Sequence, residues 1–191
     1  MDELEQRVLE RLCSQVNAPP GTAAVIVAGL RAAFPTAATA PPGQPPPPPP
    51  ERGPLPPAGL DQLAWLGLDA ETIRRLEPYV VLLPKPTPVN LNTAPREVIA
   101  ALFDGMNLAS AETLVQARKA KPLQGINDAK TYLPATVEIA ENRASVNSTF
   151  FIVTGRLRLD ERQLEQRSLV ERNGVRVEVR ARERISQLID R

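Results

Sequence analysis

The sequence predicts an α+β protein in which helices come first and a three-stranded antiparallel sheet comes last. Two observations predict this order. Apolar residues recur every three or four positions in several segments before residue 120, which is the period of a helix. Beyond Pro134 apolar and polar residues alternate instead, which is the period of a strand.

Composition and periodicity divide the chain into four parts. They are N-terminal helices over 1–34, a proline-rich linker or loop over 35–58, an α-helical domain over 59–140 and a sheet domain over 141–191. Eleven of the seventeen residues from 41 to 57 are proline, which favours an extended polyproline II segment. A solvated spacer is favoured there over a docking site for an SH3-like partner.

The first part contains two predicted helices. Residues 2–17 carry an amphipathic stripe at a spacing of four, formed by Leu4, Val8, Leu12 and Val16. Residues 19–34 form a second helix, for which the Thr22 hydroxyl is the expected N-cap. This helix is apolar nearly all round, so we expect it to be buried.

The helical domain is predicted to contain two helix pairs. In the first, over 60–79, Gly67 ends one helix and Asp69 caps the next. Prolines at 84, 86 and 88 hold the following segment extended. The second pair comprises 95–103 and 110–119, and its Ser110-Ala-Glu-Thr repeats Asp69-Ala-Glu-Thr 41 positions earlier. Both stretches begin with a capping side chain, so the pattern predicts two copies of one helix-turn-helix unit.

The stretch VNLNTAPREV is predicted to lead an extended segment into a helix. Val89 and Leu91 would point into the helical core, while Asn90 and Asn92 bond nearby backbone groups. Thr93 is the expected N-cap of the helix, and a proline follows in its first turn, where a missing N–H is harmless.

The C-terminal part is predicted to form a hairpin on a third strand. Gly155 is a candidate bulge or bend, and Asn173-Gly174 suits a type I′ turn. That turn would pair Val170 with Val177 and Glu171 with Arg176. The expected faces of the last strand are Val175, Val177, Val179 and Ala181 on one side and Arg176, Glu178, Arg180 and Arg182 on the other. The apolar side requires a helical cover.

Composition weighs against enzyme chemistry and against nucleic-acid binding. The chain has no histidine and one cysteine, Cys13, so it cannot form a Ser-His or Cys-His pair, a histidine metal site or an internal disulfide. The acids Asp104, Asp128 and Glu138 show no paired spacing. The formal charge is only +1, whereas phosphate binding needs a surplus of Lys and Arg. We therefore name no catalytic or cofactor-binding residue, expect no cofactor or small-molecule substrate, and interpret Cys13 as a small buried residue.

The stretches PVNLNTAPREVIAAL and QARKAKPLQGINDAKTYLP resemble the helix-hairpin-helix segment of competence-type DNA receptors. They more closely resemble general secretion pathway protein K, the large minor pseudopilin family of bacterial type II secretion. This second resemblance covers roughly 59–185, including SVNSTFFIVTGRLRL and the arginine-rich hairpin. It implies a helix-hairpin-helix or SAM-like domain inserted in a pseudopilin-like domain that ends in the antiparallel sheet.

The resemblance also implies a function. Such proteins are non-catalytic subunits at the tip of the periplasmic pseudopilus, bound to other minor pseudopilins. They help to initiate or cap pseudopilus assembly for protein export across the outer membrane. The family is anchored in the inner membrane by an N-terminal leader and apolar helix that this sequence lacks. We therefore expect a soluble chain from a truncated or incomplete form of a periplasmic protein.

Two further departures concern calcium and the sheet. Family members often hold calcium in an acidic loop, but here the proline tract offers only Glu51 and Asp61 as isolated acids. Metal binding is therefore not carried over and stays open. Without the long helix, the sheet lacks its usual cover, for which residues 2–17 can substitute in part.

The alternative function is DNA binding of the competence-receptor type. Helix-hairpin-helix proteins cradle a phosphate with a Gly-x-Gly turn, and this chain has Gly105-Met106-Asn107 instead. Arg118, Lys119 and Lys121 could supply positive charge, but they are equally typical of a helix C-terminus.

Overall fold

The computed structural model describes residues 3–34, 53–134, 137, 139–140 and 142–188, which fall into two units. Unit 1 is Met1–Val146 and unit 2 is Asn147–Arg191. The helices belong to the first unit and a three-stranded antiparallel sheet to the second, so the mixed helix and sheet class is confirmed. Most of the proline-rich part lies outside the described residues, and 53–57 contain neither helix nor strand.

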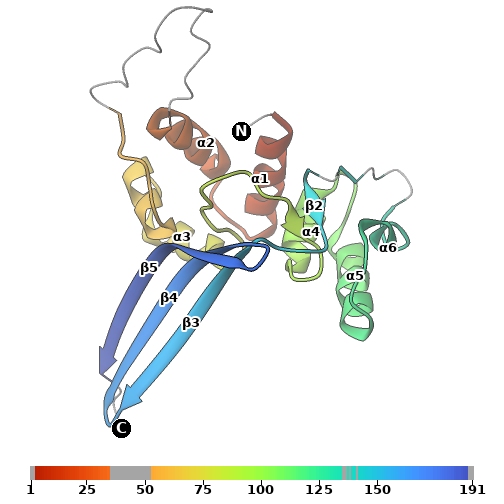
Figure 1. The fold of residues 1–191 in the computed structure, drawn as a ribbon. Helices are drawn as coiled ribbons and strands as arrows, with labels where there is room; N and C mark the ends of the chain where they lie inside the picture. Colours follow the sequence, from red (N-terminus) through yellow and green to blue (C-terminus); the bar gives the residue numbers. More distant parts are fainter. Residues whose placement is uncertain (1–2, 35–52, 135–136, 138, 141, 189–191) are drawn as a thin grey trace, which may run out of the picture. The chain divides into compact units, whose positions relative to one another are not determined.

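The elements of unit 1 are short (Figure 1). They are α1 (Glu3–Gln15), α2 (Thr22–Ala33), the 3₁₀ helix η1 (Leu60–Leu66), α3 (Ala70–Leu76), β1 (Val89–Asn90), α4 (Arg96–Leu102), α5 (Leu108–Ala120), α6 (Ile126–Lys130) and β2 (Ala144–Ser145). The two-residue strands β1 and β2 pair in parallel, Val89 with Ala144 and Asn90 with Ser145. The prolines at 84, 86 and 88 precede β1 in a segment without helix or strand, which bends at Pro84 and Lys85.

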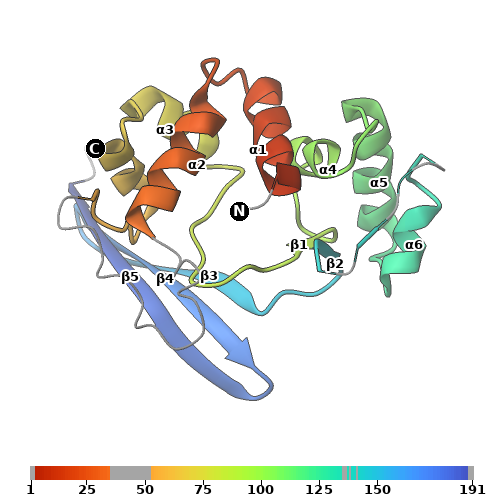
Figure 2. The same ribbon diagram turned by 90° about the horizontal axis from the view of Figure 1, so that it is seen from above.

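Two apolar clusters form the core of unit 1, and α1 contributes to both. One cluster gathers Cys13, Ala23, Ile26, Leu63, Leu68 and Leu76 from α1, α2, η1, α3 and the turn between the last two. The other is built on Leu91, Ile99 and Leu114 and is completed by residues of α4, α5 and α6. Leu9 and Val16 pack against the first cluster, and Val8 packs against the second. Figure 2 shows α1 between α2 and α4, so the apolar stripe of this helix is used inside unit 1.

The ends of three helices in the first half of the chain test the predicted caps. Gly67 ends η1 in the left-handed conformation with φ 95°, and Asp69 caps α3 by accepting from the Thr72 N–H at 2.8 Å. Both predictions are confirmed. The prediction for Thr22 is wrong, because Gly21 is the N-cap and Thr22 is already helical, donating its hydroxyl to the Pro19 carbonyl at 2.7 Å. Helix α2 also buries one face only, since Val25 is 41% exposed.

Two predicted caps in the second helix pair are also wrong. The N-cap of α5 is Asn107, whose side chain accepts from the Ser110 N–H at 2.8 Å, so Ser110 lies inside the first turn. The N-cap of α4 is Pro95, and Thr93 lies in the preceding turn. Asp69 and Ser110 thus occupy different positions relative to their helices, and the predicted repeat of the capping pattern is absent.

Unit 2 consists of β3 (Phe150–Leu159), β4 (Arg162–Asn173) and β5 (Arg176–Leu188) in the order β3-β4-β5. The predicted pairing of β4 with β5 is wrong by two residues, since Val170 pairs with Val179 in place of Val177 and Arg176 pairs with Asn173 in place of Glu171. A type I′ turn would need positive φ at both Asn173 and Gly174. Only Gly174 has it, at 61°, so the predicted turn is wrong. The pairing of Asn173 with Arg176 makes Gly174-Val175 the two-residue turn.

The bulge of the sheet lies in β5 and not at Gly155, which pairs regularly with Gln166. The register shifts between Leu169 and Val170, where Leu169 pairs with Ala181 and Val170 with Val179. Arg180 is therefore an extra residue, and every position after it moves to the opposite face. The faces predicted for Ala181 and Arg182 are wrong for this reason.

The close approach of α2 to η1 occurs at Gly29. A Cβ built there would lie 2.8 Å from the Leu66 Cβ. We expect Gly29→Ala to destabilise the protein by about 1–3 kcal/mol through overpacking, although alanine favours a helix by about 1 kcal/mol over glycine. Urea unfolding followed by the fluorescence of Trp65, the single tryptophan, measures the change.

The matched control is Ala28→Gly, at an exposed neighbouring position of the same helix. It should lose only the helix propensity of alanine, about 1 kcal/mol. A Gly29→Ala protein more stable than the parent would contradict a tight contact between α2 and η1.

Candidate functional site

Two of the acids singled out in the sequence, Asp104 and Asp128, make hydrogen bonds within the protein. Asp104 accepts from the Arg11 side chain at 3.2 Å and from the Gly105 N–H at 3.1 Å. Asp128 accepts from the backbone N–H groups of Gln124 and Gly125, which hold its pKa below the ordinary value. Glu51 and Glu138 lie outside the described residues. Within the described ranges, no group of three His, Cys, Asp or Glu side chains is placed to hold a metal.

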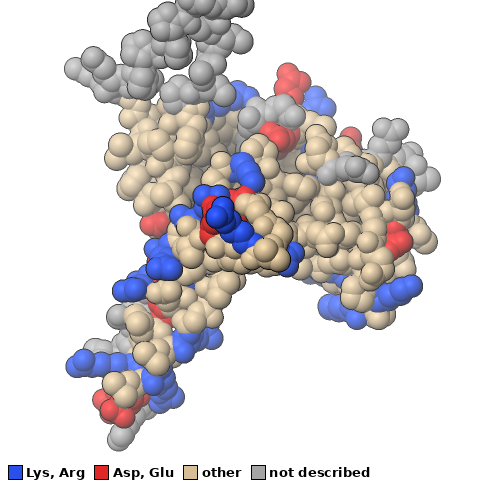
Figure 3. All heavy atoms as spheres, viewed as in Figure 1, with Lys and Arg blue, Asp and Glu red and all other residues tan. Residues whose placement is uncertain are grey.

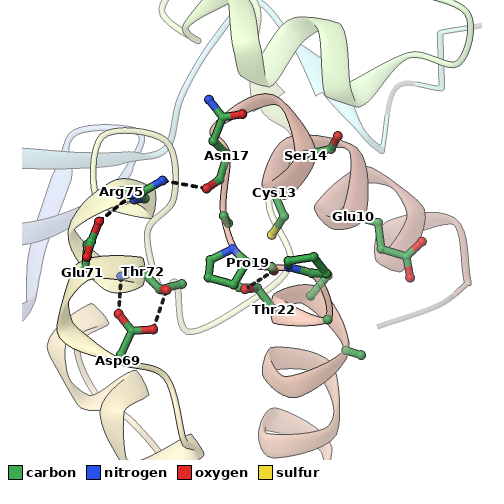
Figure 4. Close-up of a pocket in the computed structure, with 15 residues that line it drawn as sticks. Glu10, Cys13, Ser14, Asn17, Pro19, Thr22, Asp69, Glu71, Thr72 and Arg75 are labelled. Atoms are coloured by element: carbon green, nitrogen blue, oxygen red, sulfur yellow. Dashed lines mark hydrogen bonds and ion pairs between the residues drawn. The ribbon is translucent and has the colours of Figure 1, made fainter.

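A groove of about 830 Å³ runs between the α1–α2 turn and α3 (Figure 4). Its charged side chains bond to protein groups. Asp69 accepts from the Thr72 N–H and hydroxyl at 2.8 and 2.7 Å, and Arg75 donates to the Asn17 carbonyl at 2.7 Å and pairs with Glu71. These groups already hold one another, so the groove shows no convergent set of polar atoms facing an open space.

Cys13 is among the residues that line this groove and is a free, buried thiol. Burial raises the pKa of the Cys13 thiol, and the nearby Glu10 carboxylate acts in the same direction. A thiol kept protonated is a poor nucleophile. Its position in an apolar cluster agrees with the predicted role of a small packing residue.

The Asp69 cap predicts a pH dependence. The bonds from Thr72 hold the pKa of Asp69 below its ordinary value of about 4. Because the folded pKa is the lower one, the charged cap stabilises the fold fully above pH 4 and loses this effect as the pH falls through the folded value. Asp69→Asn keeps an N-cap side chain but cannot titrate.

Urea unfolding of both proteins from about pH 6 down to about pH 2.5 checks this expectation. The stability advantage of the parent over Asp69→Asn should shrink on acidification. A difference that stays constant across that range would show that the Asp69 charge does not contribute.

Asn92 joins three segments that are far apart in the sequence. Its Nδ2 donates to the carbonyls of Leu123 at 2.9 Å and Val146 at 3.1 Å, and its Oδ1 accepts from the Leu123 N–H at 2.9 Å. The backbone N–H of Asn92 donates to Asn90 Oδ1 at 2.9 Å. The prediction that both asparagines bond backbone groups is confirmed, but the partners of Asn92 lie 31 and 54 residues away.

Two residues that the DNA-binding alternative would need, Arg118 and Asn107, make hydrogen bonds within the protein. Arg118 donates to the Leu91 carbonyl, and burial lowers the pKa of its guanidinium. Asn107 has φ −107°, and its side chain holds the Ser110 N–H, one of the first-turn amides that a phosphate would need. The geometry therefore gives this alternative no specific support.

Removing the Asn92 side chain should destabilise the protein. Asn92→Ala leaves the N–H and carbonyl of Leu123 and the carbonyl of Val146 without this partner. We expect a loss of roughly 1–3 kcal/mol, since part-buried polar groups lose their hydrogen bonds. The comparison variant is Asn107→Ala, which removes one helix cap and should cost about 1 kcal/mol. Equal losses in urea unfolding would contradict a joining role for Asn92.

The two faces of the unit 2 sheet differ in chemistry. One face, the ion-pair face, carries Arg156, Glu165, Arg167, Glu171, Glu178 and Arg180. Glu165 bonds Arg156 at 2.7 Å and Arg167 at 2.8 Å, which lowers its pKa. Arg180 pairs with Glu171 at 2.7 Å and Glu178 at 2.9 Å. The charges of this face largely satisfy one another.

The opposite face, the apolar face, exposes large hydrophobic side chains. They are Phe151, Val153, Leu157 and Leu159 on β3, Leu164 on β4 and Val177 and Val179 on β5. Leu157 and Leu159 are 67% and 70% exposed. A contiguous exposed patch of this kind marks an interaction site. The apolar face is the candidate functional surface, and none of its residues was predicted as a site from the sequence. In Figure 3, Lys and Arg side chains gather over the same strands.

Among the described residues, no helix reaches the length and apolar character that crossing a membrane demands.

Comparison with known proteins identifies the region around Asn92. Residues 89–147, from β1 to just past β2, match the family model of type II secretion system (T2SS) protein K. The chain is 34% identical over 125 residues to type II secretion system protein K of Dickeya chrysanthemi, covering 61% of this chain and 35% of that protein. The values are 31% over 105 residues for the Pseudomonas aeruginosa protein, covering 54% and 31%, and 30% over 121 residues for the Pectobacterium carotovorum protein, covering 59% and 37%.

The aligned part of the chain spans about a third of the length of these curated relatives. The family-model match covers VNLNTAPREV and the helices after it, and the relatives carry the same family name, so the resemblance to protein K is confirmed. Through residues 89–147, called the protein K segment below, the chain matches the family of type II secretion system protein K.

Proposed function

We propose that the chain is a non-catalytic component of a type II secretion system and acts as a minor pseudopilin. The observation that carries this proposal is the order of two features. A protein K segment held together by Asn92 is followed directly by a three-stranded antiparallel sheet with an exposed apolar face. An assembly subunit needs surfaces of this kind and needs no set of reactive side chains.

The finer parts of the proposal follow from the family. The helical region would be a helix-hairpin-helix or SAM-like domain inserted in a pseudopilin-like domain. The protein would act in the periplasm, anchored in the inner membrane in its full form, at the tip of the pseudopilus. There it would bind other minor pseudopilins and help to initiate or cap assembly for protein export across the outer membrane.

The exposed sheet gives this proposal a physical basis. Protein interfaces bury an apolar centre within a polar rim, and aromatic residues and arginine are enriched in them. The apolar face of unit 2 has both kinds of residue, since Arg172 lies 5.1 Å from the centre of the Phe151 ring. Binding through this face would remove apolar area from water, which is the main favourable term in association.

Co-purification with the minor pseudopilins of the same secretion system tests the proposal. The tagged chain should retain at least one of them, and Leu157→Asp, on the apolar face, should weaken the association. Leu55→Asp is a control, because Leu55 is a similarly exposed leucine of unit 1. No association with any minor pseudopilin, together with salt-sensitive binding to DNA, would favour the competence-receptor alternative instead.

A further inference from the structure

The tip of the β4–β5 hairpin carries the single Asn-Gly pair of the chain. Asn173 ends β4, and Gly174 begins the two-residue turn that leads to Arg176 in β5. The carbonyl carbon of an asparagine side chain can be attacked by the backbone nitrogen of the next residue. Glycine favours this attack, because it has no Cβ to shield the nitrogen. The hairpin tip therefore combines a reactive side-chain amide with an unshielded nucleophile.

Both reacting groups are open to solvent. Asn173 and Gly174 are exposed, and the side chain of Val175 next to them is fully exposed. A Cβ built on Gly174 would meet no atom within 4 Å, so the space beside this residue is empty. Within the part of the chain that the structure describes, no hydrogen bond holds the Asn173 side chain. By contrast, the side chains of Asn92 and Asn107 are held by backbone groups.

The tip is also the part of the hairpin with the least support from the sheet. Strand β3 pairs with β4 only as far as Glu171, so Arg172 and Asn173 have β5 alone as a paired strand. A two-stranded hairpin is marginally stable, and its end opens at a small cost in free energy. Such opening lets the Asn173 side chain turn back onto the Gly174 nitrogen, a geometry that the extended backbone of a strand does not favour.

Positive charge beside the turn favours the reaction. Arg176 lies directly opposite Asn173 in the register, and its Nη1 is 4.0 Å from the Glu178 carboxylate. The nucleophile is the Gly174 nitrogen after it has lost its proton, and a nearby guanidinium stabilises that negative charge. The same guanidinium favours a carboxylate at position 173, because opposite charges on directly paired strand positions attract.

We propose that Asn173 is a site of spontaneous deamidation. The Gly174 nitrogen forms a bond to Cγ of Asn173, the bond from Cγ to Nδ2 breaks, and ammonia leaves with the proton that the nitrogen lost. Water then opens the five-membered imide at either of its two carbonyls. One opening gives aspartate and the other gives isoaspartate, in which the backbone runs through the former side chain. This modification is separate from the proposed function and does not rest on it.

The two products change the hairpin in different ways. Both carry a negative charge at neutral pH, since a carboxyl group of this kind has a pKa of about 4. Isoaspartate also adds one carbon to the backbone before Gly174. The register of a hairpin follows from the length of its turn, so the pairing of position 173 with Arg176 is the first to be disturbed.

Incubation of the whole chain in buffers of neutral to mildly alkaline pH tests the inference. Isoelectric focusing should show a more acidic species that grows with time, and faster at higher pH, because the deprotonated nitrogen is the nucleophile. A glutamate-specific protease releases residues 172–178, and mass spectrometry should find a gain of about one dalton on this peptide. A chain that forms no acidic species, or forms it without this gain, would overturn the inference.

The matched control is Asn173→Gln. It keeps a side-chain amide, but the extra carbon requires a six-membered imide that closes much more slowly, so the acidic species should be lost. Asn147 is an internal control in the parent chain, because it is exposed but is followed by Ser148, whose side chain shields the nitrogen. An acidic shift in Asn173→Gln as fast as in the parent, or equally fast deamidation at Asn147, refutes the assignment to Asn173.

Two further arms connect the reaction to the folded hairpin. In urea, ring closure should be faster than in the folded protein, because strand pairing no longer restrains Asn173. Reaction that occurs in urea alone would show that the folded tip is closed, which contradicts the inference. Freshly prepared Asn173→Asp has the charge without the added backbone carbon. Hydrogen exchange near the turn should be faster in the aged parent than in Asn173→Asp, and equal exchange would contradict the isoaspartate product.

Discussion

The side chain of Asn92 is the interaction on which the protein K segment depends. This segment has two strands of two residues each, so its ladder supplies few backbone hydrogen bonds. The Asn92 side-chain amide supplies hydrogen bonds that a longer ladder would otherwise supply. It bonds the N–H and carbonyl of Leu123 and the carbonyl of Val146. The loop after α5 and the end of β2 are thereby fixed against the start of α4. Arg118 adds a further bond to the Leu91 carbonyl.

Helix α1 links the two apolar clusters of unit 1. Its apolar residues reach both clusters, and Arg11 donates to the Ala101 carbonyl at 2.8 Å at the end of α4. Neither cluster is large, and each is built from short helices that would be marginal alone. Because α1 belongs to both clusters, the burial of its side chains in the first cluster also holds Val8 against the second. Helix α1 precedes the protein K segment in the sequence but packs against it and bonds to α4.

The bulge at Arg180 decides the chemistry of unit 2. Without it, strict alternation along β5 would place Arg180, Arg182 and Arg184 on the same face as Glu178. The extra residue keeps Arg180 beside Glu171 and Glu178 and moves the next two arginines to the apolar face. Charges of opposite sign are paired on one side of the sheet, and positive charge is left on the other. The inserted residue, Arg180, thus gives the apolar face its positive charge.

The sequence by itself determined the features that depend on neighbouring residues. Helical periodicity placed α1 to α5, Gly67 and Asp69 marked their helix ends, and alternation predicted the three strands, because each of these depends on a few adjacent side chains. VNLNTA carried enough of the family pattern to indicate protein K. The tertiary structure alone decided which of several possible residues caps α2, α4 and α5, which backbone groups Asn92 holds, and which register β5 adopts. The bonds of Asn92 join segments 31 and 54 residues apart, and the register of β5 depends on its pairing with β4. The face that we propose as a binding surface exists only once that register is set.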